Sequence, residues 1–176
     1  MNDSPPPSLS RLLQKAAPLS ALLGGYLVGL LLSLILAWTA SPPEPFHLRP
    51  AHVWNAFADF TSAELPFWAT ATLLGFCRFP RLSSIPVFFR SLIFGYGSLQ
   101  FYLWTGKGWS YFLFVLGSAL TLLPLCCVAK LSRRQSAIQR HLAWSDHQRY
   151  LFRCLYFWGL TLIILFLRSL TGLALR

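Results

Sequence analysis

Few side chains in this sequence have the type and spacing that catalysis requires. General acid–base chemistry needs a histidine or carboxylate near a reacting group, and the best candidates are His141, Asp146 and His147. No nucleophile or paired carboxylate accompanies them, and the chain contains no H-E-x-x-H, G-x-S-x-G or glycine-rich phosphate loop. We therefore predict that these three residues belong to a solvated basic face and that the protein is not an enzyme.

The sequence also lacks a pattern typical of a metal site. His47 and His52 are two imidazoles without a cysteine or carboxylate at ligand spacing, so we predict neither a metal nor a cofactor. The four cysteines lie toward the cytoplasmic ends of the membrane spans predicted below, which favours reduced thiols. They are Cys77, Cys126, Cys127 and Cys154.

The composition is typical of an integral membrane protein. Hydrophobic residues make up 55% of the 176 residues, charged residues make up 11%, and the mean hydropathy is +0.53. Fifteen Lys and Arg outnumber five Asp and Glu, which gives a net charge of +10. Because the basic residues stand between apolar runs, we expect them to set membrane orientation and predict no nucleic-acid binding. The lipid bilayer is the first partner that the sequence implies.

Apolar runs predict an all-α, polytopic bundle of five transmembrane helices. A polar leader at 1–15 precedes a single membrane domain at 16–176. The predicted spans are 17–38, 61–77, 88–106, 108–129 and 150–168. An outer loop at 41–64 places Glu64 at the membrane boundary, and a basic helix at 130–149 is expected to lie along the lipid headgroups. No carboxylate is then expected deep in a span, which disfavours a proton-coupled transporter and an intramembrane protease.

The distribution of basic residues predicts the orientation. Eleven of the fifteen lie in segments on one side of the predicted spans, and the other four are Arg49, Lys107, Arg168 and Arg176. By the positive-inside rule, the N-terminus lies inside and the C-terminus outside. We expect a multi-pass protein of the bacterial cytoplasmic membrane.

Small residues recur at every fourth position of the first span, at Ala21, Gly25, Gly29 and Ser33. Such a row forms one helix face that another backbone can approach closely. One interpretation is packing against other helices of the same chain. The alternative is a docking face for a partner or for a second copy of the chain.

The middle of the chain is interrupted by basic residues and prolines. Arg78, Pro80, Arg81, Pro86 and Arg90 follow one another within thirteen residues, which predicts a broken or re-entrant region between the second and third spans. Further along, the sequence has residues that permit close packing or a kink, namely Gly95, Gly97 and Pro124.

The same motifs carry a resemblance to a known family. From about Leu65 to Arg134, the stretch resembles the stage II sporulation protein M family. The residues that carry it are Gly75, Phe79-Pro80, Ile85-Pro86, Arg90 leading into Ile93-Phe94-Gly95-Tyr96, Gly106-Lys107-Gly108-Trp109 and Leu123-Pro124. The resemblance implies a polytopic scaffold of the engulfment complex, which recruits a peptidoglycan amidase and a lytic transglycosylase whose catalytic domains lie outside the membrane.

Two functions are compatible with these patterns. The first is a non-enzymatic scaffold, in which the Ala21 to Ser33 face docks membrane anchors of peptidoglycan hydrolases and the outer loop contacts their external domains. The alternative is a small permease or channel subunit, in which Arg78, Pro80, Pro86 and Arg90 line a broken-helix path for an anionic or small-molecule substrate.

Overall fold

The computed structural model describes residues 9–39, 53–77, 79–105, 108–138 and 144–174. These ranges contain five α-helices, two short 3₁₀ helices and no strand. The α-helices are α1 (Leu9–Thr39), α2 (Val53–Leu73), α3 (Ile85–Thr105), α4 (Gly108–Ile138) and α5 (Trp144–Ala174). The expected all-α architecture is confirmed.

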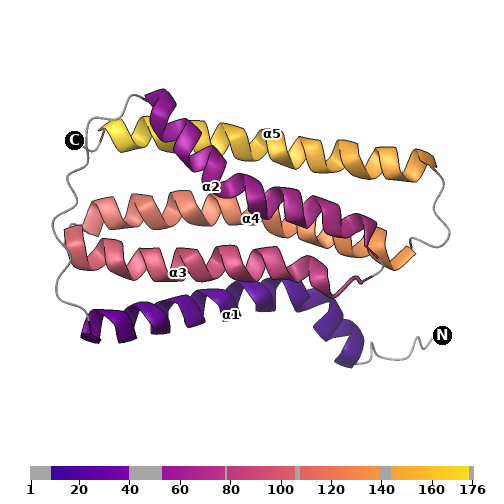
Figure 1. Ribbon diagram of the computed structural model, residues 1–176, viewed down its shortest axis with the longest axis horizontal. Coiled ribbons are helices and arrows are strands. Elements are labelled where there is room, and N and C mark those ends of the chain that lie inside the picture. Colours follow the sequence, from indigo (N-terminus) through magenta and orange to yellow (C-terminus); the bar gives the residue numbers. More distant parts are fainter. Residues whose placement is uncertain (1–8, 40–52, 78, 106–107, 139–143, 175–176) are drawn as a thin grey trace, which may run out of the picture.

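Four of these helices contain segments that are long and apolar enough to cross a membrane. The segments are Ala17–Ala37, Leu82–Leu103, Tyr111–Ile138 and Trp144–Leu170. The prediction of a multi-pass membrane protein is therefore supported, whereas α2 is not among the four. Nevertheless, α2 extends along the same long axis as its neighbours, and the start of α1 and the end of α5 lie at opposite ends of the bundle (Figure 1).

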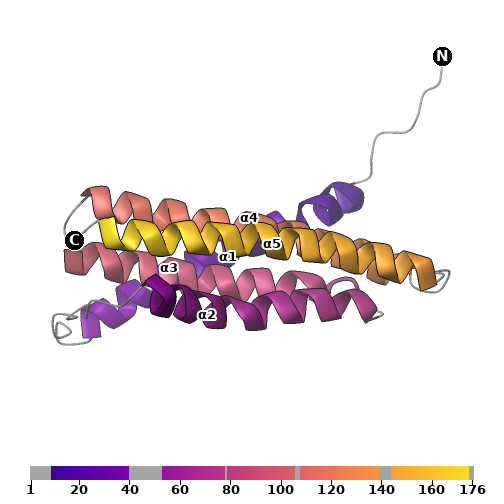
Figure 2. The same cartoon turned by 90° about the horizontal axis from the view of Figure 1, so that it is seen from above.

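Helix α4 is the centre of the bundle, because it contacts each of the other four helices (Figures 1 and 2). The buried core is drawn from four helices: Trp68 and Ala71 of α2, Val87 and Phe94 of α3, Leu122, Leu125, Val128 and Ala129 of α4, and Tyr150 and Cys154 of α5. On the outside, α1 exposes a row of leucines at helical spacing, Leu19, Leu23, Leu27 and Leu31. Such an outer surface suits a lipid environment.

The row of small residues on α1 packs against α3. A Cβ atom added to Gly25 or Gly29 would lie less than 3.0 Å from the carbonyl oxygen of Phe88 or Leu92. In return, a Cβ atom on Gly95 of α3 would meet the carbonyl oxygen of Tyr26. The two backbones therefore touch at positions where glycine has no side chain, as in other close membrane helix pairs. The packing interpretation of this face is the one that the structure supports.

The predicted central break is a turn at one end of the bundle. It consists of η1 (Leu74–Phe76) and η2 (Leu82–Ser84), and the Ser83 hydroxyl donates a 2.7 Å hydrogen bond to the Pro80 carbonyl. Pro86 follows in the first turn of α3, where a proline costs no helical hydrogen bond. Both turns contact α4 at the bundle end, which gives no support to a re-entrant segment. Arg78 lies outside the described residues.

Helices α4 and α5 are longer than the predicted spans. Each has 31 residues, or about 46 Å, against a hydrocarbon thickness of about 30 Å. The prediction of a separate interfacial helix at 130–149 is wrong, because 130–138 continues α4 and 144–149 begins α5. Ser132, Gln135 and Ser136 are buried, so tertiary contacts hold this extension of α4 in the bundle.

The bounds of other predicted segments also differ. Helix α1 begins at Leu9, inside the predicted polar leader, and α2 begins at Val53, inside the predicted outer loop. Residues 40–52 of that loop lie outside the described ranges. Pro124 lies within α4, and α3 is continuous through Gly95 and Gly97.

The close contact between α1 and α3 predicts a contrast between two adjacent glycines. Gly25→Ala forces the Phe88 carbonyl to move, and we expect a loss of roughly 1–3 kcal/mol of stability. Gly24→Ala is the matched control, since its Cβ atom would meet only Phe88 Cε2 at 3.9 Å. Thermal unfolding in detergent micelles, followed by circular dichroism, measures both variants. Equal midpoints would contradict the proposed packing.

Candidate functional site

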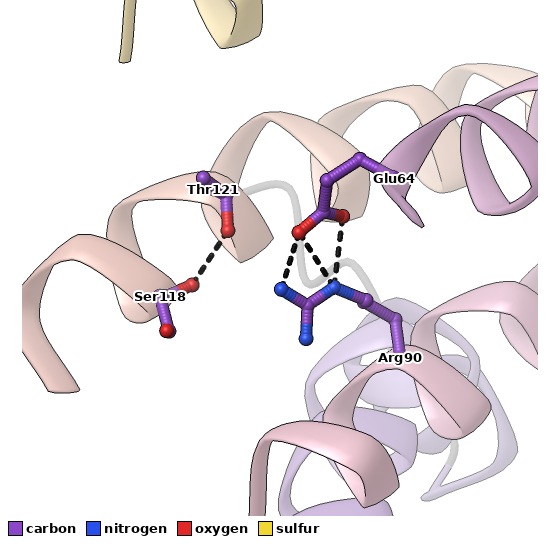
Figure 3. Close-up of polar contacts among 4 residues, drawn as sticks. All are labelled: Glu64, Arg90, Ser118 and Thr121. Atoms are coloured by element: carbon purple, nitrogen blue, oxygen red, sulfur yellow. Dashed lines mark hydrogen bonds and ion pairs between the residues drawn. The ribbon is translucent and has the colours of Figure 1, made fainter. Parts of the chain in front are cut away.

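An ion pair is buried between α2 and α3. The Nε atom of Arg90 donates hydrogen bonds to both carboxylate oxygens of Glu64 at 2.8 Å, and its Nη2 atom donates a further bond to Oε1 (Figure 3). The side chains are only 11% and 6% exposed. Oppositely charged partners with several short hydrogen bonds are the arrangement in which a buried charge is best tolerated.

Each partner lies on the buried face of its helix. Glu64 shares that face of α2 with Trp68 and Ala71, four and seven residues further on. Arg90 lies three residues after the buried Val87 and four before Phe94. Helical periodicity therefore directs both charged side chains toward the interior of the bundle.

The position of Glu64 differs from the expectation that it ends an outer loop, because it lies within α2 (Val53–Leu73). Glu64 is nine residues before the last residue of α2, Leu73, which places it about 14 Å along the helix from that end. Glu64 is buried among the helices of the bundle, and α2 begins at Val53 and not near residue 61. Since α2 is not among the four candidate spans, the expectation that spans contain no deep carboxylate stays a prediction.

A second arginine lies close to the ion pair. The guanidinium of Arg168, from α5, lies 4.6 Å from the ring centroid of Phe60 and 5.3 Å from that of Phe114. It also interacts electrostatically with Arg90 and Glu64. Aromatic faces attract a guanidinium through the ring quadrupole, so Arg168 is held inside the bundle instead of extending to the headgroups.

Polar groups of α4 and a small cavity complete the surroundings of the pair. Thr121 Oγ1 donates a 2.8 Å hydrogen bond to the Ser118 carbonyl beside the ion pair (Figure 3). A cavity of about 30 Å³, enough for about one water molecule, is lined by Glu64, Trp68 and other residues of α2 and α5. Within the described ranges, the Trp68 Nε1 atom is buried without a hydrogen-bond partner.

Further hydrogen bonds join the helices at other levels. Ser91 Oγ donates to the Leu22 carbonyl at 2.5 Å, connecting α3 to α1. The amide of Gln100 donates to Ser33 Oγ at 3.1 Å between the same two helices. The second bond uses the buried residue Ser33, which belongs to the row of small residues on α1. Some of the polar side chains inside the bundle thus link helices, whereas others, such as Ser98 and Thr161, bond to carbonyls of their own helix.

The remaining predicted residues do not gather at the ion pair. Arg81 is exposed at the turn and Pro80 and Pro86 flank η2, whereas Arg90 is buried against Glu64. Asp146 and His147 lie in the first turns of α5, where His147 Nδ1 is 3.1 Å from Gln135 Nε2 and its ring stacks on Phe76. His47, His52 and His141 are outside the described residues.

The described part of the chain does not bring together three His, Cys, Asp or Glu side chains as metal ligands. Cys77, Cys126, Cys127 and Cys154 are free thiols. No protein-family model, curated protein or solved structure matches this chain. The geometry of the buried charges is therefore the main guide to function.

Sequence reasoning missed the ion pair. Glu64 lies nine residues before the end of α2, and Arg90 lies five residues after the start of α3. The signal in the sequence was the presence of one carboxylate and one guanidinium in neighbouring apolar segments, because an unpaired charge inside a membrane bundle is costly.

The ion pair predicts a large penalty when one partner is neutralised. Glu64→Gln leaves Arg90 and Arg168 without the carboxylate, and we expect a loss of about 3–5 kcal/mol in stability. Asp59→Asn is the matched control, because it removes the same charge from an exposed position of the same helix. We expect its unfolding midpoint in detergent to stay near that of the unmodified protein.

The double variant Glu64→Leu/Arg90→Met provides the complementary test. Removing both charges should restore a large part of the stability lost in Glu64→Gln, since no unpaired partner remains in the pair itself. The stability lost in the double variant is compared with the losses in Glu64→Leu and in Arg90→Met alone. A loss equal to the sum of those two would show that the two side chains act independently.

Proposed function

We propose that this protein is a non-enzymatic membrane scaffold that presents an outer helix face to the membrane anchors of partner proteins. The observation that carries the proposal is the position of α5, which packs through one side only. The packed side contains Tyr150, Cys154 and Leu165, all of them buried. The opposite side has exposed fractions of 72% at Phe152 and 71% at Tyr156.

This outer face of α5 has a small-residue notch. A Cβ atom on Gly159 would meet no atom within 4 Å, so the position is open on the bundle surface. Leu155 and Ile163, four residues before and after it, are also exposed. A glycine between large apolar side chains permits another helix to approach closely. The α5 face therefore replaces the α1 face, which α3 already covers, as the docking surface in this proposal.

The interior of the bundle supports a scaffold better than a permease. Arg90, the arginine assigned to an anion path in the alternative, is engaged by Glu64 through three hydrogen bonds. Buried charge in this bundle stabilises the arrangement of helices, and a stable arrangement is what a scaffold requires. The proposal retains the orientation predicted by the basic residues, with the turn between α2 and α3 on the cytoplasmic side of a bacterial membrane.

The proposed partners come from the resemblance to the stage II sporulation protein M family. They are membrane-anchored peptidoglycan hydrolases, an amidase and a lytic transglycosylase, with catalytic domains outside the membrane. On this proposal, single-span anchors bind the α5 face, and the chain between α1 and α2 faces the external domains. A second copy of this chain is the alternative partner that could bind the same face.

Affinity purification after crosslinking tests the proposal. With a tag on the N-terminus and native membranes from growing and sporulating cells, we expect to recover peptidoglycan hydrolases. Gly159→Leu should abolish their recovery, because the added side chain fills the notch. Ala37→Leu is the matched control, since it also enlarges a small exposed residue, on α1 instead of α5.

Two results would contradict the proposal. Recovery of the protein alone, or with an ATPase, would favour an oligomer or a transporter. Equal recovery of hydrolases with Gly159→Leu and with the unmodified chain would remove the α5 face as the docking surface.

A further inference from the structure

A basic groove lies between α4 and α5, at the end of the bundle that carries the turn between α2 and α3. Its volume is about 260 Å³. Four residues of α4 line one wall, Leu131, Arg134, Gln135 and Ile138. Four residues of α5 line the other, Asp146, Arg149, Tyr150 and Arg153.

The spacing explains why these residues share one groove. On each helix, they occupy positions i, i+3, i+4 and i+7, which lie on a single face. Because α4 and α5 run antiparallel (Figure 1), the two faces oppose each other. Three guanidinium groups and one carboxylate give the groove a formal charge of +2.

The back of the groove is held rigidly. The Tyr150 hydroxyl donates a 2.7 Å hydrogen bond to the Thr72 carbonyl of α2, and its ring packs edge-on against Phe76. Gln135 is buried and lies 3.1 Å from His147. Arg134, Arg149 and Arg153, in contrast, are exposed at the mouth. Exposed guanidinium groups above this anchored wall are suited to binding an oxyanion.

The depth of the groove in the membrane identifies the class of ligand. The uncharged part of α4 ends at Ala129, and that of α5 begins at Cys154. The groove therefore begins at the edge of the hydrocarbon, at Leu131 and Arg153. It extends for seven residues, or about 10 Å, which covers the headgroup layer of about 5–7 Å.

The surface of α4 between the groove and the middle of the helix is suited to a hydrocarbon chain. Leu116, Leu120 and Leu123 are exposed on α4, and helical spacing places them on the same face as Leu131 and Arg134. An amphiphile would thus find guanidinium groups at headgroup depth and apolar side chains beneath them. A soluble phosphate would use only the upper part of this surface.

We propose that the groove between α4 and α5 binds the phosphate of an anionic phospholipid, with Arg134, Arg149 and Arg153 as its ligands. Arginine forms paired hydrogen bonds with phosphate oxygens, and three guanidinium groups from two helices can surround one headgroup. The bound lipid would bridge α4 and α5 at the level where they leave the membrane. This site is independent of the docking face on α5 proposed above.

Native mass spectrometry of the full chain tests the proposal. The protein is purified in micelles with equal amounts of phosphatidylglycerol and phosphatidylcholine, and the bound lipids are counted. We expect retention of phosphatidylglycerol over phosphatidylcholine. Arg149→Gln/Arg153→Gln should lower this preference roughly 30-fold, from the contribution of each basic residue near a membrane surface. Arg134→Gln, on the opposite wall, should lower it about fivefold.

The control is Arg81→Gln/Lys130→Gln, which removes two exposed charges near the same end of the bundle but outside the groove. We expect its preference to be unchanged. An equal loss in the two double variants would show diffuse attraction and overturn the site, as would an unchanged preference in the groove variants. Preferential binding of inorganic phosphate when it is offered at the same concentration as phosphatidylglycerol would assign the groove to a soluble anion and overturn the lipid assignment.

Discussion

A charge buried between membrane helices has to be neutralised at its own position, and in this protein that requirement joins α2 to α3 through Glu64 and Arg90. The constraint matters most for α2, which is not among the helices that are apolar enough to span a membrane by themselves. Its place in the bundle depends on contacts with other helices, including the ion pair, the buried Trp68 and the hydrogen bond from Tyr150 to Thr72. The arrangement of the five helices is thus specified by polar links as well as by apolar packing.

Helices α1 and α3 are held together by a different kind of contact. Lipid provides no hydrophobic drive for association, so α1 and α3 gain their contact through glycines that let the backbones touch. Ser91 and Gln100 add hydrogen bonds between the same two helices, and these satisfy polar groups that hydrocarbon would leave unpaired. The result is a framework in which several polar side chains bond to neighbouring helices. Such a framework leaves the outer side of α5 and the basic end of the bundle as the surfaces on which partners and lipids can act.

These two surfaces differ in chemistry. The outer side of α5 is apolar, with an open position at Gly159, whereas the groove between α4 and α5 is lined by three arginines. A scaffold benefits from both, because a lipid held between two long helices would keep α5 in a constant position relative to α4. The part of α4 after Ala129 is what creates the groove, since a helix ending at residue 129 would provide no wall there.

Length, apolar runs and charge determined the helical class, the membrane environment and the approximate helix positions, because each of these is a local property that one segment expresses by itself. The row at Gly25 and Gly29 likewise predicted a close contact with another helix, but it did not predict which helix that would be. Only the tertiary structure decided that α3 covers this row, that Glu64 lies inside the bundle opposite Arg90, and that the basic residues after Ala129 extend α4 instead of forming a separate helix. Those outcomes depend on which segments become neighbours, and the energy of a buried charge or of a glycine contact exists only once the neighbour is in place.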